Sequence, residues 1–287
     1  MNRLARRGFT LVELLVVIAI IGVMMAMSFP ALQASRESGR RAMCRANLAQ
    51  IMLALDSYQS AFDSLPAGVL NPDGPIRSEP KGHHLGWLVP ILPYVDQANT
   101  YRLTDLSASV YDKVNADVRA ARPSLYVCPS EPADVEVASN YAGCHHDIEA
   151  PINSDNRGVL FLNSAITRRD IPDGLSQTIF VAEKAADLTD LGWMSGTRAT
   201  LRNTGLAPNQ LAAPAAAEGA EAAGESNAAA APPLEFVGGF ASAHPGGLLV
   251  GFGDASVHFV ADTIDLDVWR QLGNRADGKL LKFNFSE

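Results

Sequence analysis

The sequence has few of the residues that build covalent or metal-bound scaffolds. It contains three cysteines, Cys44, Cys128 and Cys144, in 287 residues. These are too few for a disulfide framework, and no two of them have the C-x-x-C spacing of a zinc site. It also lacks an H-E-x-x-H motif, a Gly-x-Ser-x-Gly motif and a phosphate-binding glycine loop. We therefore expect no catalytic residues, no enzyme activity, no cofactor and no metal ligands.

Basic charge is also scarce over most of the chain. The formal net charge is −8, and most of the basic residues that cluster lie in the first 45 positions. The remainder is therefore more acidic than the total indicates. A nucleic-acid-binding surface is normally basic, so we predict no nucleic-acid partner.

A long apolar run stands out at the N-terminus. Three arginines precede Gly8, and from Phe9 to Pro30 the sequence is mostly apolar and carries a single charge, Glu13. About 20 such residues are enough to cross a bilayer as a helix, with basic residues holding their flank on the cytoplasmic side. A carboxylate inside such a run is costly unless it has a partner, so Glu13 is a functional candidate.

The stretch GFTLVELL at residues 8–15 resembles the processing site of type IV prepilins and type II secretion pseudopilins. The resemblance implies that residues 1–8 are a leader, cut between Gly8 and Phe9 by a prepilin peptidase that then methylates the Phe9 amine. Residues 9–30 would remain as the transmembrane and assembly helix. Glu13 would pair with the Phe9 amine of a neighbouring subunit, and Pro30 matches the proline that kinks the pilin helix.

The same resemblance implies partners and a location. The partners would be the prepilin peptidase, other pilin or pseudopilin subunits, an inner-membrane assembly platform and the lipid bilayer. The chain would be a single-pass protein of the inner membrane with its C-terminal head exported to the periplasm or the cell surface.

Beyond Pro30 the helical period continues through residues 31–66. An apolar stripe at intervals of three, four and seven residues predicts an amphipathic helix facing a core; it comprises Leu48, Ile51, Met52, Leu55 and Phe62. We expect an α+β, pilin-like fold in which this long helix packs against an antiparallel sheet. The head would comprise residues 67–204 and 234–287.

The head sequence predicts several elements. Two helices are expected over residues 85–101 and 105–119, strands over 125–127, 138–142, 158–162 and 178–182, a hairpin from 248–252 and 256–260, and a helix over 265–272. Residues 205–233 are rich in Ala, Pro and Gly. We predict a disordered insertion there, with a marginal Ala-rich helix as the alternative.

Nearly the whole chain, except the insertion at residues 205–233, resembles a pilin-like family of planctomycete-type bacteria, a domain of unknown function with an H-x9-D-G signature at its C-terminal end. Here the signature is His244 and Asp254, and the segments YVCPS, SNYAG and DGLSQTI match further landmarks of that family. We expect the signature to be structural. Ala255 stands where the family has Gly, so it is strained if the turn requires a positive φ.

The cysteines and histidines allow two further predictions. In an exported head, Cys128 and Cys144 would form a disulfide, leaving Cys44 unpaired or bonded between subunits. The histidines at 83–84, 145–146, 244 and 258 could gather with Asp254 around a metal, but adjacent histidines in a loop tend to point apart. The alternative is a structural calcium near residues 153–156, which the resemblance to major pseudopilins implies.

Two functions fit these features. The first is a pilin-like or pseudopilin structural subunit that polymerises into a type IV pilus or a type II secretion-like filament. The alternative is a membrane-tethered binding protein, with an unknown ligand, that does not polymerise. A Glu13→Ala substitution distinguishes the two, because a tethered receptor does not need that carboxylate.

Overall fold

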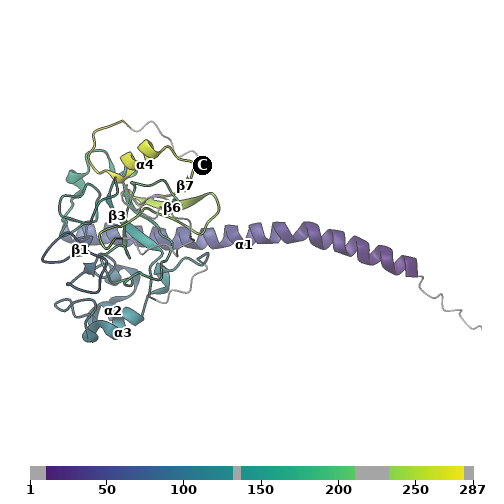
Figure 1. Cartoon of the computed structure of the whole chain (residues 1–287), viewed down its shortest axis with the longest axis horizontal. Helices are drawn as coiled ribbons and strands as arrows, with labels where there is room; N and C mark the ends of the chain where they lie inside the picture. The colour runs from purple at the N-terminus through teal and green to yellow at the C-terminus, as the bar shows by residue number, and fades with distance from the viewer. Residues whose placement is uncertain (1–10, 132–136, 211–232, 281–287) are drawn as a thin grey trace, which may run out of the picture. The chain divides into compact units, whose positions relative to one another are not determined.

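The computed structural model describes residues 11–131, 137–210 and 233–280 (Figure 1). The predicted leader, Gly8 and Phe9 lie outside these ranges, as does most of the predicted insertion at 205–233. The chain divides into two compact units, Met1–Ala42 and Met43–Glu287. Each unit is described by itself below.

The first unit contains the apolar part of helix α1 (Leu11–Phe62). Its 18-residue apolar window has a mean hydropathy of 2.6, and none of the window is buried. Among the described residues this helix is long and apolar enough to cross a membrane. Pro30 lies inside α1, and the helix continues through it. Exposed side chains of this kind need lipid or other apolar helices around them.

The C-terminal part of α1 belongs to the second unit and is buried in the head. Its buried side chains recur on one face, as predicted: they include Cys44, Leu48, Ile51, Met52 and Leu55. The prediction is wrong for Phe62, which is 59% exposed. Phe62 is the last residue of α1, and the backbone leaves the helix at Asp63 with a positive φ of 60°. The ring therefore lies beyond the part of the stripe that meets the core.

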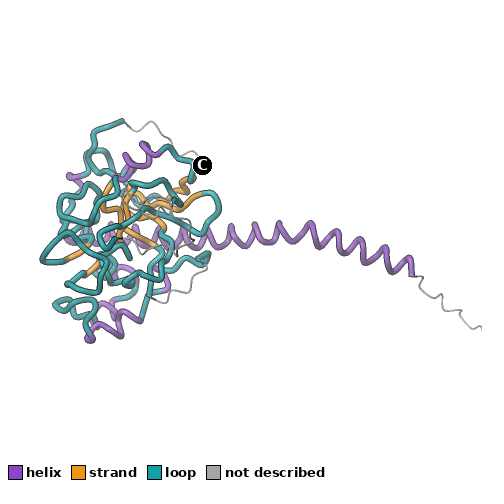
Figure 2. The backbone as a smooth tube through the Cα atoms, in the orientation of Figure 1, coloured by secondary structure: helices purple, strands orange, loops and turns teal. Residues whose placement is uncertain are grey.

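A five-stranded sheet forms the centre of the head (Figure 2). The strand order is β5-β3-β4-β6-β7, and the strands are β3 (Tyr141–His146), β4 (Ile179–Glu183), β5 (Leu201–Asn203), β6 (Gly247–Phe252) and β7 (Val257–Ala261). Three of the pairs are antiparallel, but β5 runs parallel to β3. The sheet is thus mixed, whereas the sequence predicted an antiparallel one. A separate small ladder joins β1 (Val69–Leu70) to β2 (Leu85–Gly86).

The two faces of the sheet pack against different helices. Alternation along β6 sends Leu249 toward the core that contains α1, and sends Leu248 and Val250 toward Trp269 of α4 (Leu266–Gly273). Gly251 lets α1 approach closely, because a Cβ there would lie 2.7 Å from the Met52 Cγ. The head is therefore an α+β arrangement with helix on both faces of the sheet.

The structure confirms some of the predicted strands and helices and contradicts others. The 248–260 hairpin, the strand at 178–182 and the C-terminal helix are confirmed by β6 with β7, β4 and α4. The strand predicted at 138–142 is displaced to β3. The strand predicted at 125–127 is wrong, because the structure has a 3-10 turn there, η3 (Ser124–Tyr126). The strand predicted at 158–162 is reduced to an isolated bridge from Leu162 to Val69.

The two helices predicted early in the head are mostly irregular. The first breaks into β2, η1 (Leu92–Val95) and α2 (Ala98–Leu103), and the second shortens to η2 (Lys113–Asn115) and α3 (Ala116–Ala120). Pro90 and Pro93 explain the first result, since each lacks the N–H that a helix interior requires. Two further 3-10 turns, η4 (Arg168–Asp170) and η5 (Leu175–Gln177), precede β4.

The backbone conformation of the turn between β6 and β7 allows a prediction about stability. Ala255 has a φ of +66°, so the strain expected at this position is present. A non-glycine residue there costs on the order of 1 kcal/mol. We expect Ala255→Gly to raise the free energy of unfolding by about 1 kcal/mol, measured by urea unfolding. The matched control is Ala261→Gly in β7, which should lower it by roughly 0.5–1 kcal/mol; a loss of stability in both variants would contradict the prediction.

Candidate functional site

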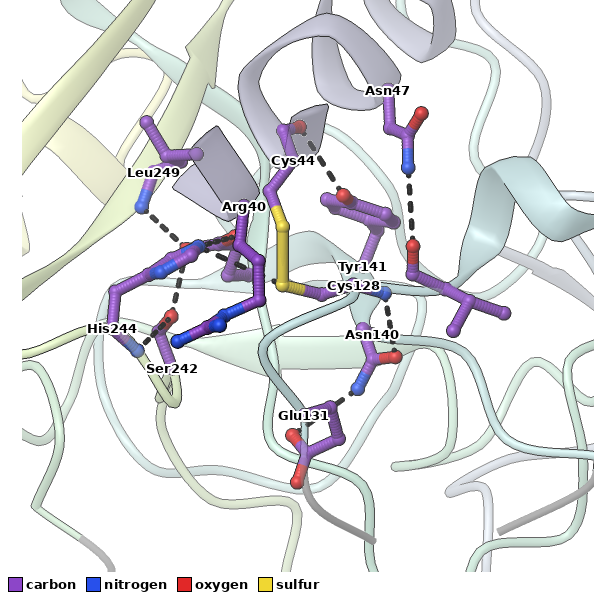
Figure 3. The surroundings of a disulfide bond; sticks show 12 residues. Arg40, Cys44, Asn47, Cys128, Glu131, Asn140, Tyr141, Ser242, His244 and Leu249 are labelled. Atoms are coloured by element: carbon purple, nitrogen blue, oxygen red, sulfur yellow. Dashed lines mark hydrogen bonds and ion pairs between the residues drawn. A yellow bond between two sulfur atoms is a disulfide. The ribbon is translucent and has the colours of Figure 1, made fainter. Parts of the chain in front are cut away.

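Four buried side chains from distant parts of the chain meet beside α1. Cys44 comes from α1, Cys128 from the loop after η3 and His244 from the loop before β6 (Figure 3). Glu183 is the last residue of β4. One ligand-type atom of each lies within 4.8 Å of the others. Among the described residues this is the one group of three or more Cys, His, Asp or Glu side chains with that property. We call it the Cys–His–Glu cluster.

A disulfide joins Cys44 to Cys128 within this cluster (Figure 3). Their Cα atoms are 5.4 Å apart, inside the usual range for such bonds. Hydrogen bonds reinforce the attachment on either side: the Tyr141 hydroxyl donates to the Cys44 carbonyl at 3.2 Å, and the Asn47 side-chain amide donates to the Val127 carbonyl at 3.1 Å. The head-embedded part of α1 is thus fixed to the loop after η3 by one covalent bond and by polar contacts.

The predicted Cys128–Cys144 disulfide is wrong. Cys144 is a free, buried thiol in β3. Its side chain lies on the α4 face of the sheet, where its Sγ is 3.6 Å from the Gly273 carbonyl, whereas Cys128 belongs to the core on the α1 face. The sheet therefore separates the two sulfurs. Burial raises the pKa of the Cys144 thiol, which keeps it protonated.

One feature of the sequence is consistent with the observed Cys44–Cys128 disulfide. Cys44 lies four residues before Leu48 and seven before Ile51, which continues the apolar stripe of the helix. Its position on that stripe indicated that Cys44 faces the head and not a neighbouring subunit. Nothing local indicated that Cys128, 84 residues further along the chain, was its partner.

His244 and Glu183 form the polar half of the cluster. The His244 Nε2 atom lies 3.2 Å from Glu183 Oε1 and 3.6 Å from the Cys128 Sγ. The second carboxylate oxygen, Oε2, accepts hydrogen bonds of 2.8 Å from the Ser242 hydroxyl and from the Leu249 backbone N–H. These bonds fix the carboxylate so that Oε1 faces His244. The side chains of His244 and Glu183 are 0% and 2% exposed, so bulk water does not screen the pair.

The structure separates the two residues of the H-x9-D signature. His244 is in the Cys–His–Glu cluster, whereas Asp254 is exposed in the β6–β7 turn, where its Oδ1 accepts a 3.0 Å hydrogen bond from the Ser256 N–H. Strand β6 lies between them, and its six residues span about 20 Å. The two signature residues therefore support different features, a buried cluster and a turn.

Within the described residues, the other histidines belong to no group of three or more potential metal ligands. His84 Nδ1 lies 2.9 Å from the Tyr111 hydroxyl, and His145 Nδ1 lies 3.1 Å from Asn156 Oδ1. Burial lowers the pKa of His145 to about 3, so its ring is neutral. The same Asn156 oxygen accepts the Asn153 N–H at 2.8 Å, which places an oxygen of the candidate calcium loop in a hydrogen-bonded turn.

The sequence interpretation missed a second set of buried charges. Lys184 follows Glu183 directly and forms a buried ion pair with Asp190. Burial lowers the pKa of Lys184 below its ordinary value, although the Asp190 carboxylate acts in the opposite direction. The Lys184 ammonium also donates to the Ser139 carbonyl at 3.3 Å. A sequence analysis normally assigns charged residues to the surface. A charged residue can be buried when it has an ion-pair partner, and that partner is known only from the tertiary structure.

The N-terminal site residues lie partly within the described chain. Glu13 is in the first turn of α1 and is exposed. The predicted cleavage site, Gly8–Phe9, precedes the described residues.

Comparisons with known proteins identify two regions. Residues 33–267 match the family described as a protein of unknown function (DUF1559). The chain belongs to this family. Residues 3–29 match the prokaryotic N-terminal methylation motif. No curated protein and no solved structure matches the chain.

The two matches divide the candidate residues between them. The methylation motif contains Gly8, Phe9 and Glu13, which implies processing by a prepilin peptidase and a pilin-like protein in general. Together with the exposed apolar part of α1, it fits a membrane-anchored protein. The DUF1559 match contains the whole Cys–His–Glu cluster as well as Asp254.

Proposed function

We propose that this DUF1559 chain is a pseudopilin-type structural subunit that assembles into a type IV pilus or a type II secretion-like filament. The observation that carries the proposal is the methylation motif at residues 3–29, which leads into an apolar helix with none of its window buried. The protein acts by polymerisation and not by catalysis. Its N-terminal helix is held in the inner membrane before assembly, and its head is exported.

The exposed helix supports the proposal physically. The large side chains from Leu11 to Leu32 that point outward are apolar, and 44–77% of the surface of each is exposed. Such a surface is stable in lipid before assembly and in a bundle of identical helices afterwards, because both environments exclude water. A helix that served only as an anchor would need contact with lipid alone, whereas a filament subunit also uses this surface for contacts with other helices.

Glu13 supports assembly over simple anchoring. An ionised side chain costs roughly 2.5–3.5 kcal/mol at the centre of a bilayer-spanning helix on insertion scales. Glu13 lies near the N-terminal end of the apolar run, in the first turn of α1, so its cost is smaller but still favours a partner. Cleavage after Gly8 would create an amine at Phe9, four residues before Glu13. The amine of one subunit and the carboxylate of the next would then neutralise each other in the filament and set the axial position of each subunit.

The attachment of the head also suits a subunit that is moved by its helix. The Cys44–Cys128 disulfide and the Tyr141 and Asn47 hydrogen bonds link the embedded part of α1 to the rest of the head. A force applied along α1 is therefore carried into the head through a covalent bond as well as through apolar packing.

Mass analysis of the N-terminus tests the proposal. The protein is purified from the membranes of cells with an active prepilin peptidase and from matched cells that lack the enzyme. We expect a mature chain that begins at methylated Phe9 in the first and an unprocessed chain that begins at Met1 in the second. A chain beginning at Met1 in both would contradict the proposal and would favour the tethered binding protein.

A further inference from the structure

We propose that the Cys–His–Glu cluster binds one Zn²⁺ ion when Cys44 and Cys128 are reduced. The four ligands would be the two thiolates, His244 Nε2 and Glu183 Oε1. This site is independent of the proposed filament function, since neither processing nor assembly at the N-terminus requires it. Zn²⁺ and the disulfide would be alternative states of the same two cysteines.

Two of the ligand-to-ligand distances in the cluster match those of a tetrahedral zinc site. Zinc bonds of about 2.3 Å to sulfur and about 2.0–2.1 Å to nitrogen and oxygen place neighbouring S and N ligands about 3.6 Å apart and N and O ligands about 3.3 Å apart. The observed separations are 3.6 Å from Cys128 Sγ to His244 Nε2 and 3.2 Å from His244 Nε2 to Glu183 Oε1. All four ligand atoms lie within 4.8 Å of one another. The two bonded sulfurs must move apart, which rotation of the two side chains would allow once the bond is broken.

Neighbouring hydrogen bonds orient the ligands before any metal binds. Glu183 Oε2 is held by the Ser242 hydroxyl and the Leu249 N–H, which leaves Oε1 directed at the centre of the cluster without a hydrogen bond. The Cys128 N–H donates to Asn140 Oδ1 at 3.0 Å (Figure 3). Such supporting contacts typically change metal affinity by 10–100-fold.

The charge and the burial of the Cys–His–Glu cluster both favour a divalent metal ion. Two thiolates and the Glu183 carboxylate would place three negative charges in a site where all four residues are buried. Buried charge of one sign is costly unless it is neutralised or coordinates a metal. A divalent ion with borderline-soft character suits sulfur, imidazole and carboxylate together, and four protein ligands leave no open position. The geometry therefore predicts a closed, structural site.

The two states of the cysteines provide an internal control. Sulfurs joined in a disulfide carry no thiolate charge, so the oxidised chain should not bind the metal through them. Cys144 provides a second control, because it is a buried thiol on the opposite face of the sheet with no place in the cluster. Zinc binding that depends on Cys144 would come from another source.

Metal binding by the full-length chain in detergent, without a polyhistidine tag, tests the proposal. A phosphine reductant cleaves the disulfide to two thiols, Zn²⁺ is added, and bound metal is counted by mass spectrometry after desalting. We expect about one Zn²⁺ per reduced chain and none per oxidised chain. Co²⁺ in place of Zn²⁺ should show the sulfur-to-metal charge-transfer band and the visible bands of tetrahedral coordination.

Matched variants assign the ligands. His244→Ala and Glu183→Gln should each weaken Zn²⁺ binding at least ~10-fold, whereas His83→Ala and Cys144→Ser should not change it. A folded, reduced chain that binds no stoichiometric metal, or Co²⁺ without sulfur ligation, would overturn the proposal. Equal losses in the His83 and His244 variants would overturn it too. If a cluster variant fails to fold, the cobalt spectrum of the unsubstituted chain decides the question.

Discussion

Reduction of the Cys44–Cys128 disulfide is expected to lower the free energy of unfolding of the head by about 4.6 kcal/mol. The bond joins residues 84 positions apart, so it removes a large amount of chain entropy from the unfolded state. The loop-entropy relation gives about 4.6 kcal/mol at 25 °C for a loop of this length. In a domain of this size the loss corresponds to a decrease in melting temperature of roughly 10–18 °C.

Urea unfolding of the oxidised and the reduced chain measures this effect. A chelator must be present in both samples, because Zn²⁺ bound to the reduced cysteines would restore part of the stability. The control is Cys144→Ser, in which reduction should cost the same amount. The double variant Cys44→Ser, Cys128→Ser should be insensitive to reductant. A difference below about 1 kcal/mol between the oxidised and reduced states would contradict the assigned pairing as a stabilising bond.

Glu13→Ala is expected to reduce incorporation of the subunit into filaments about 100-fold. In the proposed filament this carboxylate pairs with the Phe9 amine of the next subunit. The substitution removes the carboxylate and leaves that amine unpaired among apolar helices. A loss of about 3 kcal/mol per subunit contact is of the size measured for charges within bilayer-spanning helices. It corresponds to a factor of about 150 in an equilibrium constant.

The measurement compares the amount of subunit in sheared filaments with the amount in membranes. Glu37→Ala is the matched control, because Glu37 is a carboxylate of the same helix that pairs with Arg40 and lies beyond the apolar run. It should change incorporation by no more than about twofold, since a surface ion pair contributes little. Methylation of Phe9 and membrane insertion should persist in both variants. Normal incorporation of the Glu13 variant would contradict the proposed pairing of Glu13 with the Phe9 amine, whereas absence of the unsubstituted chain from filaments would support the tethered binding protein instead.

Features that depend on neighbouring residues could be predicted from the sequence. The described part of the apolar run, up to Pro30, and the stripe of Leu48, Ile51 and Leu55 lie in one continuous helix, α1. The stripe was predictable because a helix brings residues three and four apart onto one face. The β6–β7 hairpin and the strain at Ala255 were predictable for the same reason, since a short turn fixes its own register.

The irregular part of the head was much less predictable. Residues 125–127 have the composition of a strand but form the 3-10 turn η3. Leu162 reaches the small ladder only as an isolated bridge to Val69. Whether a short apolar segment becomes a strand depends on a free sheet edge beside it, and that edge is supplied by residues far away in the sequence.

The sequence by itself determined the apolar helix, its processing motif, the glutamate within it and the face of α1 that enters the head, because each rests on periodicity or on adjacent residues. Only the tertiary structure decided the partner of Cys128 and the convergence of Glu183 and His244 on that disulfide. A shift of one residue in strand register moves each side chain to the opposite face of the sheet. The face of Cys144, and with it the true disulfide, was therefore settled by strand register and not by spacing along the chain.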